Sequence, residues 1–151
     1  MRILIQRVKQ ASVTIDDKLK SAIKGGMLIL VGIEDADTDE DIEWLCGKIV
    51  KLRIFDDDNG VMNLSISDLP DLDILVVSQF TLHASTKKGN RPSFINAQKP
   101  DTAKELYEYF CEVLNKEIPV KTGVFGADMQ IENCCDGPVT IILNTDIWNK
   151  K

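Results

Sequence analysis

Two short, continuously apolar runs constrain the fold of this chain more than any other feature. Met27-Leu28-Ile29-Leu30-Val31 and Ile74-Leu75-Val76-Val77 are short and contain several β-branched residues, a pattern that favours buried strands over helices. Consecutive side chains of a strand point to opposite faces of the sheet. A strand that is apolar at every position therefore has to be covered on both sides, which requires a layered fold.

Most of the remaining chain alternates apolar and polar residues over short stretches, as strands with one buried face do. Residues 11–16 and 19–24 flank Asp16-Asp17-Lys18, a sequence typical of a hairpin turn. The other strands predicted in this way are 2–9, 52–55, 118–125, 129–133 and 139–144. The last two are separated by Asp136-Gly137-Pro138.

Two segments instead repeat apolar residues at the spacing of one helix face. Thr38 with Asp41 is typical of a helix N-terminus, and Pro100-Asp101 of a second one. The apolar stripes are Ile42, Leu45, Cys46, Ile49 and Leu52 in the first helix, and Ala103, Leu106, Tyr107, Phe110, Val113 and Leu114 in the second. Many strands and two helices predict an α/β fold with a three-layer β/β/α arrangement: two stacked, barrel-like sheets with two main helices on one outer face. The length suits a single domain, 1–151, in which we assign no role to the polar tail 149–151.

Charge and cysteine content limit the partners of this chain. A net charge of -6 argues against a broad electrostatic grip on nucleic acid, and we expect no DNA binding. The acidic run at 56–60 lacks the ligand spacing of a calcium loop, and the four cysteines lack the Cys-x-x-Cys spacing of a zinc site, so we expect neither a metal nor a cofactor. No apolar run approaches the roughly 20 residues that span a bilayer, and no signal-peptide pattern is visible, so we expect a cytoplasmic protein with reduced cysteines.

The end of the strand 74–77 breaks the apolar pattern with three hydrogen-bonding side chains, those of Ser78, Gln79 and Thr81. A polar group that is buried without a partner costs about 1–3 kcal/mol, so these groups are either satisfied by local turn contacts or directed into a pocket. One interpretation is a hydrolase with Ser78 or Thr81 as nucleophile and His83, the only histidine, as its base. No nucleophile-elbow pattern surrounds Ser78.

Three motifs, one of them at this strand end, are informative when taken together. They are Ser78-Gln79-Phe80-Thr81-Leu82, Gly89-Asn90-Arg91-Pro92-Ser93-Phe94 and Asp136-Gly137-Pro138-Val139-Thr140. On these motifs the chain resembles the D-aminoacyl-tRNA deacylase family. Further stretches match the same family in the same order, namely Gln6-Arg7-Val8, Leu52-Arg53-Ile54-Phe55 and Gly123-Val124-Phe125-Gly126-Ala127-Asp128-Met129. The resemblance covers nearly the whole chain and implies the same three-layer fold.

The resemblance implies a hydrolase of translation quality control that cleaves the ester between a D-amino acid and the terminal ribose of tRNA. The ester carbonyl would lie against Ser78, Gln79 and Thr81, where backbone N–H groups would stabilise the oxyanion, at ~3 kcal/mol for one donor. A ribose hydroxyl of the substrate would help to position or activate the attacking water. The implied substrate pocket is lined by Phe80, Phe125, Gly126, Ala127 and Met129.

The resemblance further implies a homodimer in which a cis Gly137-Pro138 bond enters the active site of the partner subunit. This wedge would exclude L-amino acids by a clash while admitting D-amino acids and glycine, so glycyl-tRNA would also be hydrolysed. Arg7 would help to fix the carbonyls of the wedge. Without the family, Gly137-Pro138 is interpreted as a hairpin turn and Arg7 as a surface charge on a strand.

Contact with the 3′ end of a tRNA would require only a local basic patch, which Lys87, Lys88 and Arg91 would supply unless they belong to a solvated loop. The chain departs from the family pattern at His83 and at Cys135, where Asn usually precedes Asp-Gly-Pro. A competing function is a nucleic-acid-binding or scaffold protein that keeps the fold without hydrolysis.

Overall fold

The fold was obtained as a computed structural model, which describes residues 1–148; the polar tail 149–151 lies outside the described residues. The strands are β1 (Arg2–Ile15), β2 (Lys18–Ile23), β3 (Gly26–Gly32), β4 (Phe55–Asp56), β5 (Met62–Leu64), β6 (Asp73–Ser78), β7 (Val120–Thr122) and β8 (Gln130–Asn144). The helices are α1 (Asp39–Lys51), α2 (Pro100–Asn115) and the short α3 (Thr145–Trp148), with 3₁₀ turns η1 (Ile66–Asp68) and η2 (Phe80–His83). Within residues 1–148, no helix has both the length and the apolar character needed to span a membrane.

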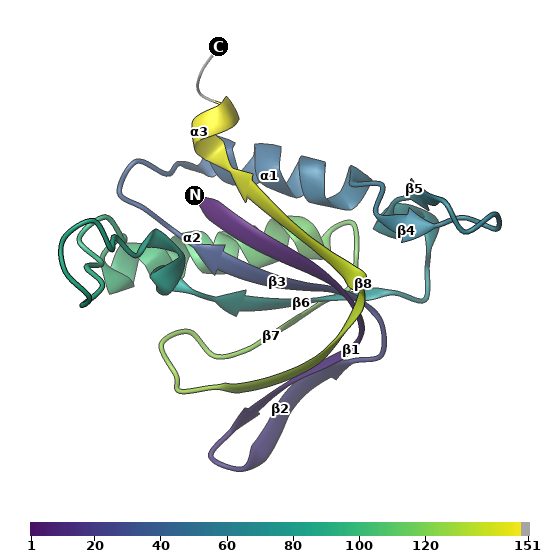
Figure 1. The fold of residues 1–151 in the computed structure, drawn as a ribbon, viewed down its shortest axis with the longest axis horizontal. Helices are drawn as coiled ribbons and strands as arrows, with labels where there is room; N and C mark the ends of the chain where they lie inside the picture. Colours follow the sequence, from purple (N-terminus) through teal and green to yellow (C-terminus); the bar gives the residue numbers. More distant parts are fainter. Residues whose placement is uncertain (149–151) are drawn as a thin grey trace.

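The main sheet is built around β1 (Figure 1). β2 and β3 pair with successive parts of one edge of β1, and β8 pairs along its other edge, all antiparallel. β6 lies parallel to β3, and β7 lies parallel to β6. The sheet bends so that β7 returns toward β2, where Ser21 Oγ donates to the carbonyl of Thr122 over 2.7 Å. The six-stranded sheet is therefore barrel-like and nearly closed, while β4 and β5 form a small second sheet.

The side chains of β3 and β6 alternate between two hydrophobic cores. The side chains that face the helices are Met27, Ile29, Val31, Ile74 and Val76, and those in the second core, on the barrel side of the sheet, are Leu28, Leu75 and Val77. All eight are essentially inaccessible to solvent. The prediction that the strand 27–31 is covered on both sides is confirmed, because helices cover one face and the curled sheet covers the other.

Both main helices lie on the outer face of the sheet and begin where the sequence predicts (Figure 1). A capping box starts α1, in which the Thr38 backbone N–H donates to Asp41 Oδ2 over 2.9 Å and the Asp41 backbone N–H donates to Thr38 Oγ1 over 3.4 Å. Pro100 occupies the first turn of α2, where its missing N–H costs no helical hydrogen bond. The predicted α/β class, with barrel-like sheets and two main helices on one outer face, is confirmed.

The strand boundaries differ from the predictions in four places. Segments 2–9 and 11–16 form one strand, β1, and 129–133 and 139–144 form one strand, β8, because these two strands pair at both ends, from Arg2↔Asn144 to Thr14↔Gln130. The predicted strands 52–55 and 118–125 shrink to β4 and β7. A strand lasts only as long as its partner does: β4 has the three-residue β5 beside it, and β7 leaves β6 after Thr122.

The interpretation of Gly137-Pro138 as a hairpin turn is wrong, because both residues lie inside β8. The pairing of β1 with β8 shifts between Gln6↔Thr140 and Val8↔Cys135, so that Arg7 alone stands opposite residues 136–139. The extra residues leave the plane of the ladder as a bulge. Gly137 and Pro138 are exposed on it, and the peptide bond between them is cis.

Candidate active site

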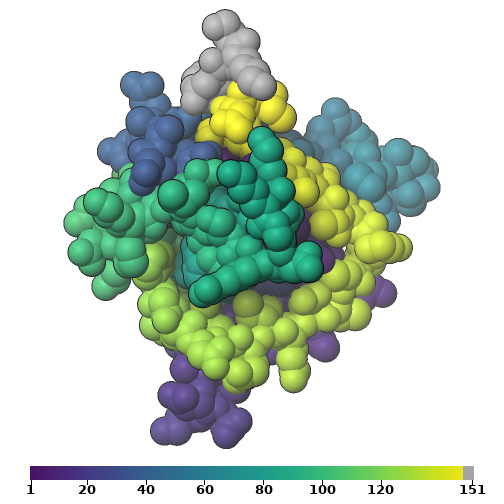
Figure 2. Space-filling view, turned by 60° about the vertical axis from the view of Figure 1, so that its left-hand side comes forward, coloured from purple at the N-terminus to yellow at the C-terminus, as the bar shows by residue number. Residues whose placement is uncertain are grey.

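A cavity of about 660 Å³ opens at the end of β6 where Ser78 lies. β6 keeps its pairing with β3 as far as Val31↔Ser78, whereas its pairing with β7 ends at Val76↔Thr122. Beyond Val76 the edge of β6 toward β7 therefore faces open space. Figure 2 shows this recess between the loop that follows β6 and the segment that leads into β8. The lining residues that were predicted for the site are Ser78, Gln79, Phe80, Phe125, Gly126, Ala127 and Met129.

The last hydrogen bond between β6 and the segment that follows β7 is made at the carbonyl of Val76. This oxygen accepts one hydrogen bond from the Gly123 backbone N–H over 3.2 Å and one from the Tyr107 hydroxyl of α2 over 2.9 Å. Burial raises the pKa of Tyr107 well above its ordinary value, so its hydroxyl remains a neutral donor. The Tyr107 ring also contacts Phe125, with 5.8 Å between the ring centroids. Helix α2 thus positions one wall of the cavity.

The segment after Ser78 turns sharply instead of continuing as a strand. The Gln79 backbone N–H donates to the carbonyl of Val31 over 2.7 Å, and η2 starts at the next residue. The Gln79 side-chain amide donates to Thr81 Oγ1, so these two polar groups satisfy each other at the surface. Phe80 projects outward, with 56% of its surface exposed, and packs edge-to-face on Phe94 at 5.0 Å between centroids. Thr81 itself does not line the cavity.

The interpretation of His83 as the base of a hydroxyl nucleophile is wrong. It required Thr81 and His83 to share one side of a strand, but residues 80–83 form a 3₁₀ turn. The imidazole is buried with 6% exposure, and its Nε2 has no hydrogen-bond partner. The Thr81 hydroxyl, in contrast, is exposed and paired with Gln79. His83 therefore packs beneath the turn and makes no hydrogen bond to either hydroxyl.

Arg7, Gly137 and Pro138 do not line the cavity of their own chain but form a separate group at the bulge of β8. The Arg7 side chain is 8% exposed, so its interpretation as a surface charge is wrong. Its Nε donates to the carbonyl of Asp136 over 3.0 Å, and its Nη1 donates to the carbonyl of Ile54 over 2.7 Å and to Asp56 Oδ1 over 3.1 Å. The guanidinium thus ties the segment before β4 to the residue that precedes Gly137.

The remaining predicted residues lie away from the recess. Lys87, Lys88 and Arg91 are exposed in the loop that Ser85 and Ser93 close by an antiparallel bridge.

Among residues 1–148, no group of three or more His, Cys, Asp or Glu side chains is placed to hold a metal ion. Cys46 and Cys111 are reduced, and burial raises the pKa of each thiol to about 12. Neither thiol has the thiolate character that a nucleophile or metal ligand needs.

One part of the cavity rim was absent from the predicted site. Phe94, Ala97, Gln98 and Lys99 line it and come from the loop before α2. This loop has no periodicity, and its only available signal was the aromatic residue at the end of the Gly89–Phe94 motif. The Phe94 ring packs edge-to-face on Phe80, which brings this part of the loop to the cavity.

Known proteins of similar sequence match nearly the whole length of this chain. A family model described as D-Tyr-tRNA(Tyr) deacylase matches residues 4–144. A protein of Flavobacterium johnsoniae named D-aminoacyl-tRNA deacylase is 60% identical over 147 residues, covering 96% of this chain and 97% of that protein. One of Bacteroides fragilis (strain YCH46) with the same name is 64% identical over 149 residues, covering 96% of this chain and 97% of that protein.

Two solved structures are similar as well. The c-Myc DNA unwinding element binding protein superposes with a TM-score of 0.90 at 41% identity, covering 95% of this chain and 98% of that one. A probable eukaryotic D-amino acid tRNA deacylase superposes with a TM-score of 0.80 at 21% identity, covering 94% and 97%, and supports the fold alone. From the family match over residues 4–144 and the relatives of 60% identity and above, we conclude that the chain belongs to the D-Tyr-tRNA(Tyr) deacylase family.

Proposed function

We propose that the protein hydrolyses the ester bond of D-aminoacyl-tRNA and releases the D-amino acid and free tRNA. The observation that carries this proposal is the cavity at the end of β6, where Ser78, Gln79 and Phe80 meet a second segment, 125–129, from far along the chain. The cavity is lined mostly by apolar residues with a few polar ones among them, as small-molecule sites usually are.

Backbone groups of the turn, and not a side-chain nucleophile, are proposed to promote the reaction. The first N–H groups of a helical turn have no acceptor within that turn, which leaves the N–H groups of Phe80 and Thr81 for a developing oxyanion. His83 makes no hydrogen bond to a hydroxyl here, so the chain offers no base in this position. We propose that water attacks the ester directly and that a ribose hydroxyl of the substrate helps to position or activate it.

Chiral selection is proposed to come from a second copy of the chain. Gly137 and Pro138 are exposed on the bulge and lie outside the cavity of their own chain. In a homodimer the bulge of one protomer would close the cavity of the other. Backbone atoms at the α-carbon of the substrate would leave no room for an L side chain, whereas D-amino acids and glycine would fit. We therefore include glycyl-tRNA among the substrates.

The tRNA is proposed to be held at its 3′ end alone. The exposed Lys87, Lys88 and Arg91 lie in the loop that follows η2 and offer positive charge on a chain of net charge -6. A local contact of this kind reads no sequence and weakens with added salt. The cytoplasm, where charged tRNA is used, is the proposed location.

A deacylation assay with D-tyrosyl-, L-tyrosyl- and glycyl-tRNA tests the proposal, together with a measurement of molecular mass in solution. We expect hydrolysis of the D and glycyl esters, survival of the L ester, and a mass of two chains. Gly137→Ala is the variant that disturbs the proposed wedge. An added Cβ would lie 2.9 Å from Val139 Cγ2, on a backbone with φ of +128°. Gly47→Ala in α1, where nothing lies within 4 Å of the added Cβ, is its control. Equal rates on the D and L esters would overturn the proposed selection.

A nucleic-acid-binding role without hydrolysis is the second candidate. It is favoured by the 41% identity to a protein whose name states binding to a DNA unwinding element. The acidic net charge argues against it. Binding of duplex DNA at 150 mM salt by a protein that hydrolyses no D-aminoacyl-tRNA would favour this candidate.

A further inference from the structure

The turn of the candidate active site rests directly on the backbone of β3. A Cβ added to Gly32 would lie 3.0 Å from the Gln79 carbonyl oxygen, 3.0 Å from Leu82 Cβ and 3.0 Å from His83 Cδ2. Contacts this short are tighter than a side chain ordinarily makes, and one of them is with a backbone atom that cannot swing aside. The missing side chain of Gly32 therefore sets how closely η2 approaches the sheet.

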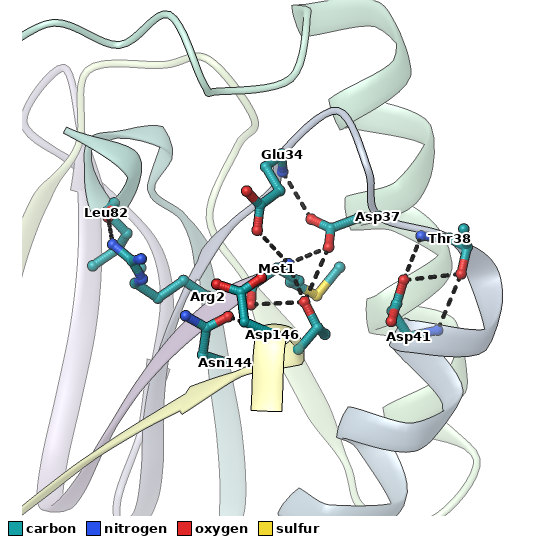
Figure 3. Close-up of polar contacts among 10 residues, drawn as sticks. Met1, Arg2, Glu34, Asp37, Thr38, Asp41, Leu82, Asn144 and Asp146 are labelled. Atoms are coloured by element: carbon teal, nitrogen blue, oxygen red, sulfur yellow. Dashed lines mark hydrogen bonds and ion pairs between the residues drawn. The ribbon is translucent and has the colours of Figure 1, made fainter. Parts of the chain in front are cut away.

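A second residue, Arg2 of the neighbouring strand β1, contacts the same turn. Arg2 stands opposite Gly32 in the pairing of β1 with β3, so both residues present their side-chain positions to the same face of the sheet. The Arg2 guanidinium reaches over this position, and its Nη1 donates to the carbonyl of Leu82 over 2.7 Å. Figure 3 shows the extended Arg2 side chain ending at Leu82. The turn thus packs on Gly32 and accepts a hydrogen bond from the charged side chain of Arg2. We call these two contacts the seat and the clamp of the turn.

The backbone that precedes the Arg2 side chain is held in place by several contacts of Met1. The amino group of the preceding residue, Met1, is fully buried and forms ion pairs with Glu34, at 3.1 Å, and with the buried Asp37. The Thr145 backbone N–H donates to the carbonyl of Met1 over 3.1 Å, which joins the start of α3 to the same residue. The guanidinium of Arg2 is therefore presented from a fixed support.

We propose that Arg2 and Gly32 are positioning residues that fix the height and direction of the Gln79–Thr81 segment in the candidate active site. This proposal rests on the proposed function for its catalytic consequence, but the seating of the turn is independent of it. Neither residue touches the cavity, so each acts through η2. Displacing catalytic donors by about 1 Å costs up to 10²-fold in rate, which is the range in which both variants should fall.

Arg2→Met tests the clamp, because it removes the donors and keeps a long apolar stem. Gly32→Ala tests the seat. Both are expected to lower kcat on D-tyrosyl-tRNA by about tenfold or more while KM changes less than about threefold, because the cavity wall formed by residues 125–129 is unaltered. Arg2→Lys, which retains a donor, should recover most of the loss. The matched controls are Arg53→Met, which removes an exposed guanidinium from Asn63, and Gly47→Ala.

Amide hydrogen exchange supplies a readout that needs no activity. The Leu82 and Ala84 N–H groups are bonded to the carbonyls of Gln79 and Thr81, so a loosened turn exposes them. We expect their exchange to accelerate about tenfold in Arg2→Met and Gly32→Ala and to stay unchanged in both controls. Unchanged exchange in both test variants would overturn the proposal, as would accelerated exchange with an unchanged kcat. If the wild-type protein hydrolyses no D-aminoacyl-tRNA, the proposed function fails while exchange still decides the seating, and Gly32→Ala decides it alone if Arg2→Met does not fold.

Discussion

Replacing Arg7 with methionine should destabilise the protein by about 3–4 kcal/mol. The guanidinium is buried and donates to two backbone carbonyls, those of Ile54 and Asp136. Hydrogen bonds from a charged donor contribute about 1.5–3 kcal/mol each, and the lower end applies because the bulge leaves Asp136 partly open to water. The ion pairs with Asp56, 52% exposed, and Asp136, 39% exposed, add at most about 1 kcal/mol.

Urea unfolding at fixed protein concentration measures this loss, since dissociation of an oligomer would make the midpoint depend on concentration. The corresponding decrease in melting temperature is roughly 10 °C for a chain of this size. Asp56→Asn removes the charge of the ion pair with Asp56 and leaves the contacts of Arg7 with Ile54 and Asp136, so it should cost less than about 1 kcal/mol. Arg7→Lys keeps one donor and should fall between the two. An Arg7→Met protein within 0.5 kcal/mol of wild type would refute the view that this guanidinium holds the bulge.

Three further outcomes follow from the structure. Phe110→Ala should cost about 3–5 kcal/mol in urea unfolding, because its ring is fully buried beneath the sheet, and a loss below 1 kcal/mol would contradict that packing. Thr81→Ala should lower kcat less than about tenfold if backbone donors dominate, whereas an inactive variant and a trapped acyl-enzyme in the wild type would identify a hydroxyl nucleophile. The backbone N–H of Ser65 holds the pKa of Asp68 below its ordinary value of 3.8, so the stability it contributes is present above that pH and is lost as pH falls through the lowered value. Asp68→Asn should therefore flatten the acid side of a stability curve measured by urea between about pH 7 and pH 2, and an unchanged slope would count against this cap.

The fold was predictable where local patterns and burial agree. The apolar runs at 27–31 and 74–77 are covered on both faces, and Thr38 with Pro100 marked both main helix starts. A cavity at the end of β6 was predictable for the same reason, since a polar group at the end of a buried strand has to find a partner or a cavity.

Long-range pairing decided what the sequence could not. Gly137-Pro138 is a turn signal on its own, but β1 pairs with β8 on both sides of it and keeps the strand continuous. His83 would have faced the side of Thr81 in a strand, and the 3₁₀ turn instead buries it. Phe94 and Lys99 reach the cavity from a loop without periodicity, so only the tertiary structure brings them there.

The bulge of β8 also bears on edge-to-edge pairing of this strand with strands of other molecules. Within residues 1–148, β8 pairs with β1 alone, which leaves one side of a strand of 15 residues without a ladder partner. A straight border of that length is a template for aggregation. The four residues opposite Arg7 interrupt the regular pattern of hydrogen-bonding groups along β8 near its middle. Pro138 also lacks a backbone N–H and so removes one donor from this edge. The same bulge that presents Gly137 and Pro138 therefore interrupts the edge along which an incoming strand would have to pair.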